Sequence, residues 1–172
     1  MAKTLYLIGG PMGVGKTTAA RTLCDALPAA VMLDGDWCWC ASPFQVTPET
    51  KRMALDNIVH VLANFLRCSA YENVIFCWVM HEQAIIDTIL GALPLYESYA
   101  EVHAVSLVAS EEALSERIAR DVETGLRDAG AIERACSYLP RYQELGTRII
   151  DTTELSPHEV AEQIAQRPLG DR

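Results

Sequence analysis

The sequence predicts a three-layer α/β fold, with a parallel sheet between two layers of helices. Short apolar segments alternate with segments of helical periodicity along the chain. Strands that alternate with helices need crossover connections, which place the strands parallel. The chain has 172 residues, within the size range of one domain, and contains no internal repeat or low-complexity linker. We therefore expect a single domain over residues 1–172.

Strands are expected where short apolar runs are bounded by polar or glycine-containing segments. The run at 73–79 lacks apolar–polar alternation, so we expect helices to cover both of its faces. The full set of expected strands is 5–9, 30–34, 73–79, 101–108 and 148–151.

Helices are expected between these strands, several of them with clear start signals. Thr47, Pro48 and Glu49 supply an N-cap, a first-turn proline and a first-turn acid. Ser156 and Glu159 have capping-box spacing. Pro140 is expected to interrupt one helix. The expected helices are 16–27, 48–69, 82–93, 110–121, 131–145 and 156–166.

Composition and charge narrow the function classes. Half of the residues are apolar, 22% are charged and the net charge is −9, with no Lys/Arg-rich run. Such a chain is a poor partner for nucleic acid, whose binding depends on neutralising phosphates. No apolar run approaches the roughly 20 residues that span a bilayer. We expect a cytoplasmic protein with reduced cysteines, without a membrane or metal-cluster role; the oligomeric state cannot be read.

A glycine-rich segment, G-P-M-G-V-G-K-T, follows the first expected strand and opens a helix. Gly10, Gly13 and Gly15 permit a tight turn whose backbone N–H groups point at phosphate oxygens. In such a P-loop, Lys16 reaches the β- and γ-phosphates and Thr17 holds Mg²⁺. We expect binding of ATP with Mg²⁺. The predicted nucleotide-binding residues are Gly10, Met12, Gly13, Val14, Gly15, Lys16, Thr17 and Thr18.

The second expected strand ends in two carboxylates, Asp34 and Asp36. At the carboxyl end of a parallel strand, one can hold the hydration shell of magnesium and the other can take a proton from an attacking hydroxyl. The alternative is a polar turn that caps the following segment. The chain lacks the N-K-x-D segment of GTPases and an apolar strand ending in Asp-Glu, which argues against dedicated hydrolysis.

The P-loop followed by L-D-G-D resembles the shikimate, gluconate and adenylylsulfate kinases and chloramphenicol phosphotransferase. The resemblance implies a P-loop NTPase fold with a five-stranded parallel sheet in the order 2-3-1-4-5 and an arginine-bearing lid. It also implies a substrate site between the lid and the long helix. By this resemblance Asp34 faces magnesium and Asp36 faces the substrate hydroxyl.

The expected lid covers about residues 121–131. Arg120 and Arg127 are the preferred phosphate contacts, because lid arginines neutralise charge in the transition state. Arg117 is the alternative for either role, or covers the adenine. In the plainer interpretation all three lie on a solvated helix face, with Glu116 and Asp121 as partners.

The acceptor site has weaker signals. Trp37 and Trp39, with a nearby phenylalanine, either form an apolar wall or pack against the long helix. The strand end at 78–82 is the other wall, and supplies His81 and Glu82, although Glu82 is also an ordinary first-turn acid. Arg52 matches only loosely the arginine that binds acidic acceptors in similar kinases. Few cations are expected there, which favours a neutral or cationic acceptor.

These features predict an ATP-dependent kinase that phosphorylates a hydroxyl of a small metabolite or antibiotic. A nucleoside or nucleotide kinase is the first alternative, since the aromatic side chains could stack a base. A nucleotide-binding regulatory ATPase module is the second, but such a module needs neither an acceptor base nor a phosphate-closing lid.

Overall fold

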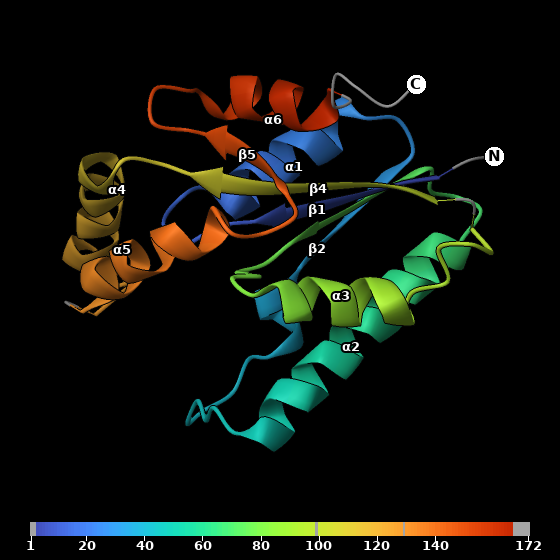
Figure 1. The fold of residues 1–172 in the computed structure, drawn as a ribbon, viewed down its shortest axis with the longest axis horizontal. Coiled ribbons are helices and arrows are strands. Elements are labelled where there is room, and N and C mark those ends of the chain that lie inside the picture. Colours follow the sequence, from blue (N-terminus) through green and yellow to red (C-terminus); the bar gives the residue numbers. More distant parts are fainter. Residues whose placement is uncertain (1–2, 99, 129, 167–172) are drawn as a thin grey trace.

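The computed structural model describes residues 3–98, 100–128 and 130–166. Its centre is a five-stranded sheet in the order β2-β3-β1-β4-β5, with every neighbouring pair parallel (Figure 1). This confirms the fold class and the strand order implied by the resemblance. The strands are β1 (Lys3–Gly9), β2 (Ala30–Asp34), β3 (Asn73–Cys77), β4 (Ala100–Val108) and β5 (Arg148–Asp151).

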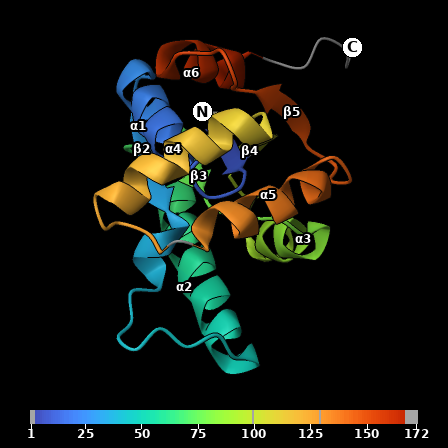
Figure 2. The same ribbon diagram turned by 90° about the vertical axis from the view of Figure 1, so that its left-hand side faces the viewer.

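Helices cover both faces of the sheet. Helices α1 and α6 lie on one face and α2 and α3 on the other (Figure 1). Helices α4 and α5 lie at the end where the strands terminate and cross in front of the sheet in Figure 2. The helices are α1 (Lys16–Ala26), α2 (Pro48–Arg67), α3 (Gln83–Ala92), α4 (Glu111–Glu123), α5 (Ala131–Tyr142) and α6 (Pro157–Ala165), with a 3₁₀ turn η1 (Gly35–Cys38).

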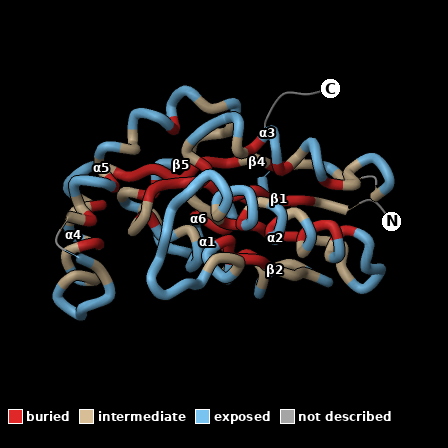
Figure 3. The backbone as a smooth tube through the Cα atoms, turned by 90° about the horizontal axis from the view of Figure 1, so that it is seen from below, coloured by how far each residue is buried: buried red, intermediate tan, exposed pale blue. Residues whose placement is uncertain are grey.

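The sheet separates two apolar cores. Along β1, Leu5 and Leu7 pack with α2 and α3, whereas Tyr6 and Ile8 pack on the side of α1 and α6. Both sets are buried (Figure 3), which explains why the sequences of the strands are continuously apolar and do not alternate with polar residues. The inference from the run at 73–79, that helices cover both of its faces, is confirmed.

Two sequence expectations need correction. Strand β3 ends at Cys77, not at residue 79, and the chain from Trp78 onward leaves the sheet, with a positive φ of 30° at Met80. Pro140 does not interrupt α5 but lies within it. Because Pro140 falls in the exposed last turn, its missing N–H removes little helical bonding. The helix ends at Tyr142, whose hydroxyl donates to the Val79 carbonyl at 2.6 Å.

Helix starts agree better with expectation. Thr47 caps α2 with Pro48 at its first turn, and a capping box forms with Thr50. The capping box of Ser156 and Glu159 opens α6 as predicted. Among the described helices, none is both long and apolar enough to cross a membrane.

Candidate active site

The P-loop joins β1 to α1 at the carboxyl edge of the sheet. A Cβ added at Gly10 would lie 2.6 Å from the Leu107 carbonyl oxygen, and one at Gly13 would lie 2.4 Å from the Ile118 side chain. Gly15 has a φ of 102°, which side chains rarely tolerate. Helix α1 then begins at Lys16 without a side-chain cap. Its first N–H groups are therefore available to an anion.

The ammonium of Lys16 reaches back over this loop. It donates to the Pro11 carbonyl at 2.8 Å. Burial lowers the pKa of Lys16 to about 8, although nearby carboxylates, including Asp36 and Asp34, partly oppose the shift. A buried ammonium of this kind is stabilised by an arriving anion.

Asp34 links the P-loop to the second strand. The Thr17 hydroxyl donates to its Oδ2 at 2.6 Å, and the Asp36 backbone N–H donates to its Oδ1 at 3.0 Å. Asp34 therefore caps η1, as the alternative interpretation expects of a polar turn, and it also faces Thr17. The Cys77 thiol lies beside Asp34, and burial raises its pKa to about 12, so it stays protonated.

The donor set around Thr17 and Asp34 fits Mg²⁺. A hydroxyl and a carboxylate are hard oxygen ligands. In the described part of the chain, no three His, Cys, Asp or Glu residues come together as a metal site. That is compatible with Mg²⁺, which keeps several waters and takes other ligands from substrate phosphates.

Asp36 is oriented by a residue that directly follows another strand, β3. The indole Nε1 of Trp78 donates to Asp36 Oδ1 at 3.2 Å. Trp78 packs against Gly35, where an added Cβ would lie only 2.5 Å from the indole. The small residue between the two aspartates therefore lets the indole approach the second carboxylate.

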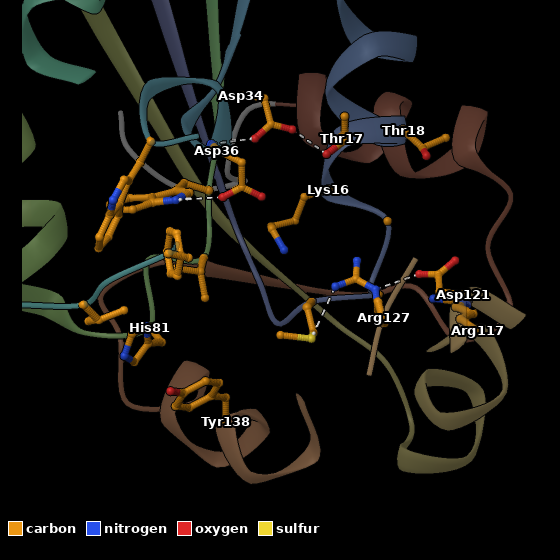
Figure 4. Close-up of a pocket in the computed structure, with 18 residues that line it drawn as sticks. Lys16, Thr17, Thr18, Asp34, Asp36, His81, Arg117, Asp121, Arg127 and Tyr138 are labelled. Atoms are coloured by element: carbon orange, nitrogen blue, oxygen red, sulfur yellow. Dashed lines mark hydrogen bonds and ion pairs between the residues drawn. The ribbon is translucent and has the colours of Figure 1, made fainter. Parts of the chain in front are cut away.

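These groups line one cavity of about 810 Å³ (Figure 4). Its donor half, as we name it, combines P-loop and charged side chains: Met12, Gly13, Gly15, Lys16, Thr17, Thr18, Asp34, Arg117, Asp121 and Arg127. Its acceptor half is largely apolar: Trp39, Phe44, Val46, Trp78, Val79, His81 and Tyr138. In Figure 4, Asp36 and Lys16 lie between Arg127 on one side and His81 and Tyr138 on the other.

The three candidate arginines have different surroundings. Arg127 lines the cavity, and its Nε donates to Asp121 Oδ2 at 2.8 Å. Arg117 donates to the carbonyl of Thr152 at 2.8 Å and to that of Val14 at 3.4 Å, so it ties the P-loop to the segment after β5. Arg120 is exposed on α4 and does not line the cavity. The position of Arg127 agrees with a phosphate contact, whereas that of Arg120 does not support one.

The acceptor half contains two ring pairs. The rings of Trp39 and Phe44 are 4.7 Å apart between centroids, and those of His81 and Tyr138 are 4.6 Å apart. Burial lowers the pKa of His81, which favours the neutral imidazole. Trp39 lines the cavity, as expected of an apolar wall.

Other sequence candidates lie outside the cavity. Trp37 is 57% exposed, and Arg52 is exposed on α2. Glu82 accepts from Arg141 Nη1 at 3.4 Å and lies 3.4 Å from His81 Nε2. None of these three residues lines the cavity, so a direct role in substrate binding has no geometric support.

Three residues line the cavity although the sequence did not predict it: Val46, Tyr138 and Asp121, which was expected only as a partner of the arginines. Tyr138 lies on α5 and carries no motif signal; only the packing of that helix against the sheet edge brings it to the cavity. The hydrogen bond from Trp78 to Asp36 was also missed, although the strand end had been expected as a wall.

Comparisons with known proteins agree with this fold. A family model described as "AAA domain" matches residues 7–135. A gluconokinase from Sinorhizobium meliloti 1021 superimposes with a TM-score of 0.66 at 19% identity, covering 94% of this chain and 89% of that one. The tunicamycin resistance protein of Deinococcus radiodurans gives 0.64 at 24% identity, covering 95% and 94%.

A shikimate kinase from Acinetobacter baumannii, solved with shikimate, gives a TM-score of 0.62 at 23% identity, covering 95% of this chain and 91% of that one. At such identities the likeness establishes the fold alone. The search of curated proteins found no match. The family model spans most of the chain, so the chain belongs to the AAA domain family, in the fold of small P-loop kinases.

Proposed function

We propose that the protein is a kinase that transfers the γ-phosphate of Mg·ATP to a hydroxyl of a small molecule. The observation that carries the proposal is a single cavity with a P-loop at one end, aromatic residues at the other and Asp36 between them. Similar folds in proteins titled gluconokinase and shikimate kinase support it. A hydrolase would need no organic acceptor site beside its phosphates.

In this proposal the donor half binds and orients ATP. The P-loop N–H groups and Lys16 hold the phosphates, and Arg127 neutralises charge on the group in transfer. Thr17 and Asp34 would hold Mg²⁺, which supplies charge neutralisation on the β- and γ-phosphates. Arg117 supports the nucleotide site indirectly, through its bonds to the Val14 and Thr152 carbonyls.

Asp36 acts as the base. The acceptor oxygen forms a bond to the γ-phosphorus while the bond from that phosphorus to the ADP oxygen breaks. The hydroxyl proton passes to the Asp36 carboxylate, and ADP leaves with the electron pair. The Trp78 indole, 3.2 Å from Asp36 Oδ1, fixes the carboxylate for this task.

The test is an acceptor screen with purified protein and Mg·ATP, followed by mass spectrometry for products that have gained one phosphoryl group. Sugars, sugar acids, aromatic alcohols and nucleosides should be included. We expect at least one phosphorylated alcohol, formed in a one-to-one ratio with ADP and absent with Lys16→Ala. Formation of ADP and free phosphate only, whatever alcohol is added, would contradict the proposal.

We also propose a cytoplasmic location. All six cysteines are free thiols, as expected in a reducing compartment, and ATP is available there.

A further inference from the structure

We propose that the acceptor half binds an uncharged alcohol with a flat, apolar body, and not a sugar acid or another anion. The inference rests on the proposed kinase function, which leaves the acceptor open, and names its substrate class. It follows from the charges, the ring geometry and the exposed rim of the acceptor half.

The acceptor half offers no cation to a carboxylate. None of its seven residues is Lys or Arg. The cavity's own cations, Lys16, Arg117 and Arg127, are in the donor half, where the phosphates of ATP would occupy them. An anionic acceptor would lie next to the Asp36 carboxylate without a partner, and an unpaired charge in a partly buried site is costly.

The basic side chains that act on His81 from outside the cavity, Arg141 and Lys51, do not change this conclusion, because neither lines the cavity. The guanidinium carbon of Arg141 lies over the ring of Tyr138, 5.0 Å from its centroid, and Arg141 Nη1 lies 3.4 Å from Glu82 Oε1. It does not line the cavity. His81 does line it, but its lowered pKa keeps the imidazole neutral near pH 7.

His81 adds no fixed charge to the site. Among the described residues, its Nδ1 is one of two buried side-chain polar atoms that have no hydrogen-bond partner. A neutral imidazole can exchange hydrogen bonds with a hydroxyl or an amide but cannot act as a fixed cation. Because this Nδ1 is shielded from water, the exposed Asp36 is the polar group that can orient an uncharged acceptor in a largely apolar site.

The rings define the shape of the acceptor. Trp39 pairs with Phe44, and His81 pairs with Tyr138, so flat surfaces from separate segments line the site. Phe44 and Val46 remain 59% and 58% exposed although they line the cavity. An apolar body bound there would remove this surface from water, which stabilises the complex in proportion to the apolar area buried.

The experiment uses intrinsic fluorescence, because two of the three tryptophans, Trp39 and Trp78, line the acceptor half. Matched ligands are titrated with Mg²⁺ and a non-hydrolysable ATP analogue present. Phenyl glucoside is compared with phenyl glucuronide, and hydroxymethylbenzamide with hydroxymethylbenzoate, since each pair differs chiefly in charge. Methyl glucoside, which lacks the flat body, is the third comparison.

We expect each uncharged aromatic ligand to quench fluorescence with a Kd at least about tenfold below that of the matched anionic ligand. A tenfold ratio corresponds to about 1.4 kcal/mol, and burying an unpaired charge costs more than that. Methyl glucoside should bind more weakly than phenyl glucoside. Val46→Arg, a change at the exposed rim, should reduce the discrimination against both anions. Phe44→Leu, which keeps the charge but removes a ring, should weaken both members of each pair and leave their ratio unchanged.

Equal or tighter binding of the anionic twins would overturn the inference, as would a failure of both uncharged aromatic ligands to quench. Either result leaves the kinase proposal intact if any alcohol is phosphorylated in the acceptor screen. Conversely, tight binding of the uncharged ligands without phosphorylation of any alcohol would leave the inferred binding preference standing and remove the kinase proposal.

Discussion

The two halves of the cavity are built in different ways. The donor half comes mainly from one continuous loop and is held by short contacts, such as the 2.6 Å bond from Thr17 to the nearly buried Asp34. The acceptor half comes from three separate parts of the chain, namely residues 39–46, residues 78–81 and Tyr138 on α5, and part of its rim is open to water. The phosphates of ATP do not vary, so a rigid site suits them. Acceptors differ from one kinase to another, so they suit a site whose wall residues can be exchanged without disturbing the fold.

The comparison makes the halves separable by mutation. Changes in the donor half should affect ATP binding or the transfer step whatever the acceptor. Changes in the acceptor half should alter the choice of acceptor while ATP binding persists.

The largest effect is expected from Lys16→Ala. It removes the buried ammonium at the phosphates, and loss of one such charge-stabilising group lowers turnover by about 100-fold to 1,000-fold. The measurement is the rate of ADP formation with Mg·ATP. Arg67→Ala is the control, since Arg67 is exposed in the last turn of α2 and lies outside the cavity. Unchanged ATP turnover in Lys16→Ala would rule out the P-loop assignment.

The second largest effect, a loss of kcat, is expected from Arg127→Ala. The variant loses a cation that lines the donor half, so kcat should fall about 100-fold, with the acceptor preference unchanged. Arg120→Ala, seven residues earlier on the exposed face of α4, should stay within about twofold of the wild type. If the Arg120 variant showed the larger loss in steady-state kinetics, the lid would have to close in another arrangement.

A smaller effect than those of the two substitutions is expected from pH, which should change the Kd for ATP by at most about tenfold per pH unit. The pKa of Lys16 is lowered to about 8, so the unliganded protein loses the ammonium charge as the pH rises past that value. Binding then requires proton uptake, and the Kd for ATP rises by up to about tenfold per unit above pH 8. Lys16→Arg, which stays charged, should have a flat profile; a flat wild-type profile between pH 8 and 10 would contradict this.

The smallest effect is expected from Trp78→Phe. The ring remains, but the 3.2 Å hydrogen bond to Asp36 is lost. A contribution of about 1 kcal/mol corresponds to a kcat roughly fivefold lower. The KM for ATP should not change, because the donor half is untouched. Trp37→Phe, at an exposed position outside the cavity, is the matched control. A change in the KM for ATP instead of kcat would make Trp78 a packing residue only.

The same contrast explains what the sequence could predict. Residues of the P-loop and the pair Asp34 and Asp36 lie at or just after the ends of strands, and strand ends in a parallel sheet meet at one edge. The fold was predictable because helices and strands alternate in clear apolar patterns. Tyr138 was not predictable, because it reaches the cavity only through the packing of α5, whose last residue, Tyr142, bonds to the Val79 carbonyl.

The misplaced end of β3 and the undecided choice between the lid arginines have similar causes. The end of β3 at Cys77 depends on a turn with positive φ at Met80, which apolar residues do not signal. The choice between Arg120 and Arg127 depends on the direction in which α4 ends, and spacing along the chain does not determine that. The predictions that Arg120 contacts phosphate and that residues 121–131 form a lid stay predictions.

Asp36→Asn tests most directly the claim that one cavity joins a nucleotide donor to an alcohol acceptor. ATP affinity and product formation should be measured on the same preparation with the acceptor from the screen. We expect the Kd for ATP to stay within about twofold, because the donor half is intact, while transfer falls by about 100-fold or more with the loss of the base. Transfer at the wild-type rate would contradict the assigned base and the proposed meeting of donor and acceptor at Asp36.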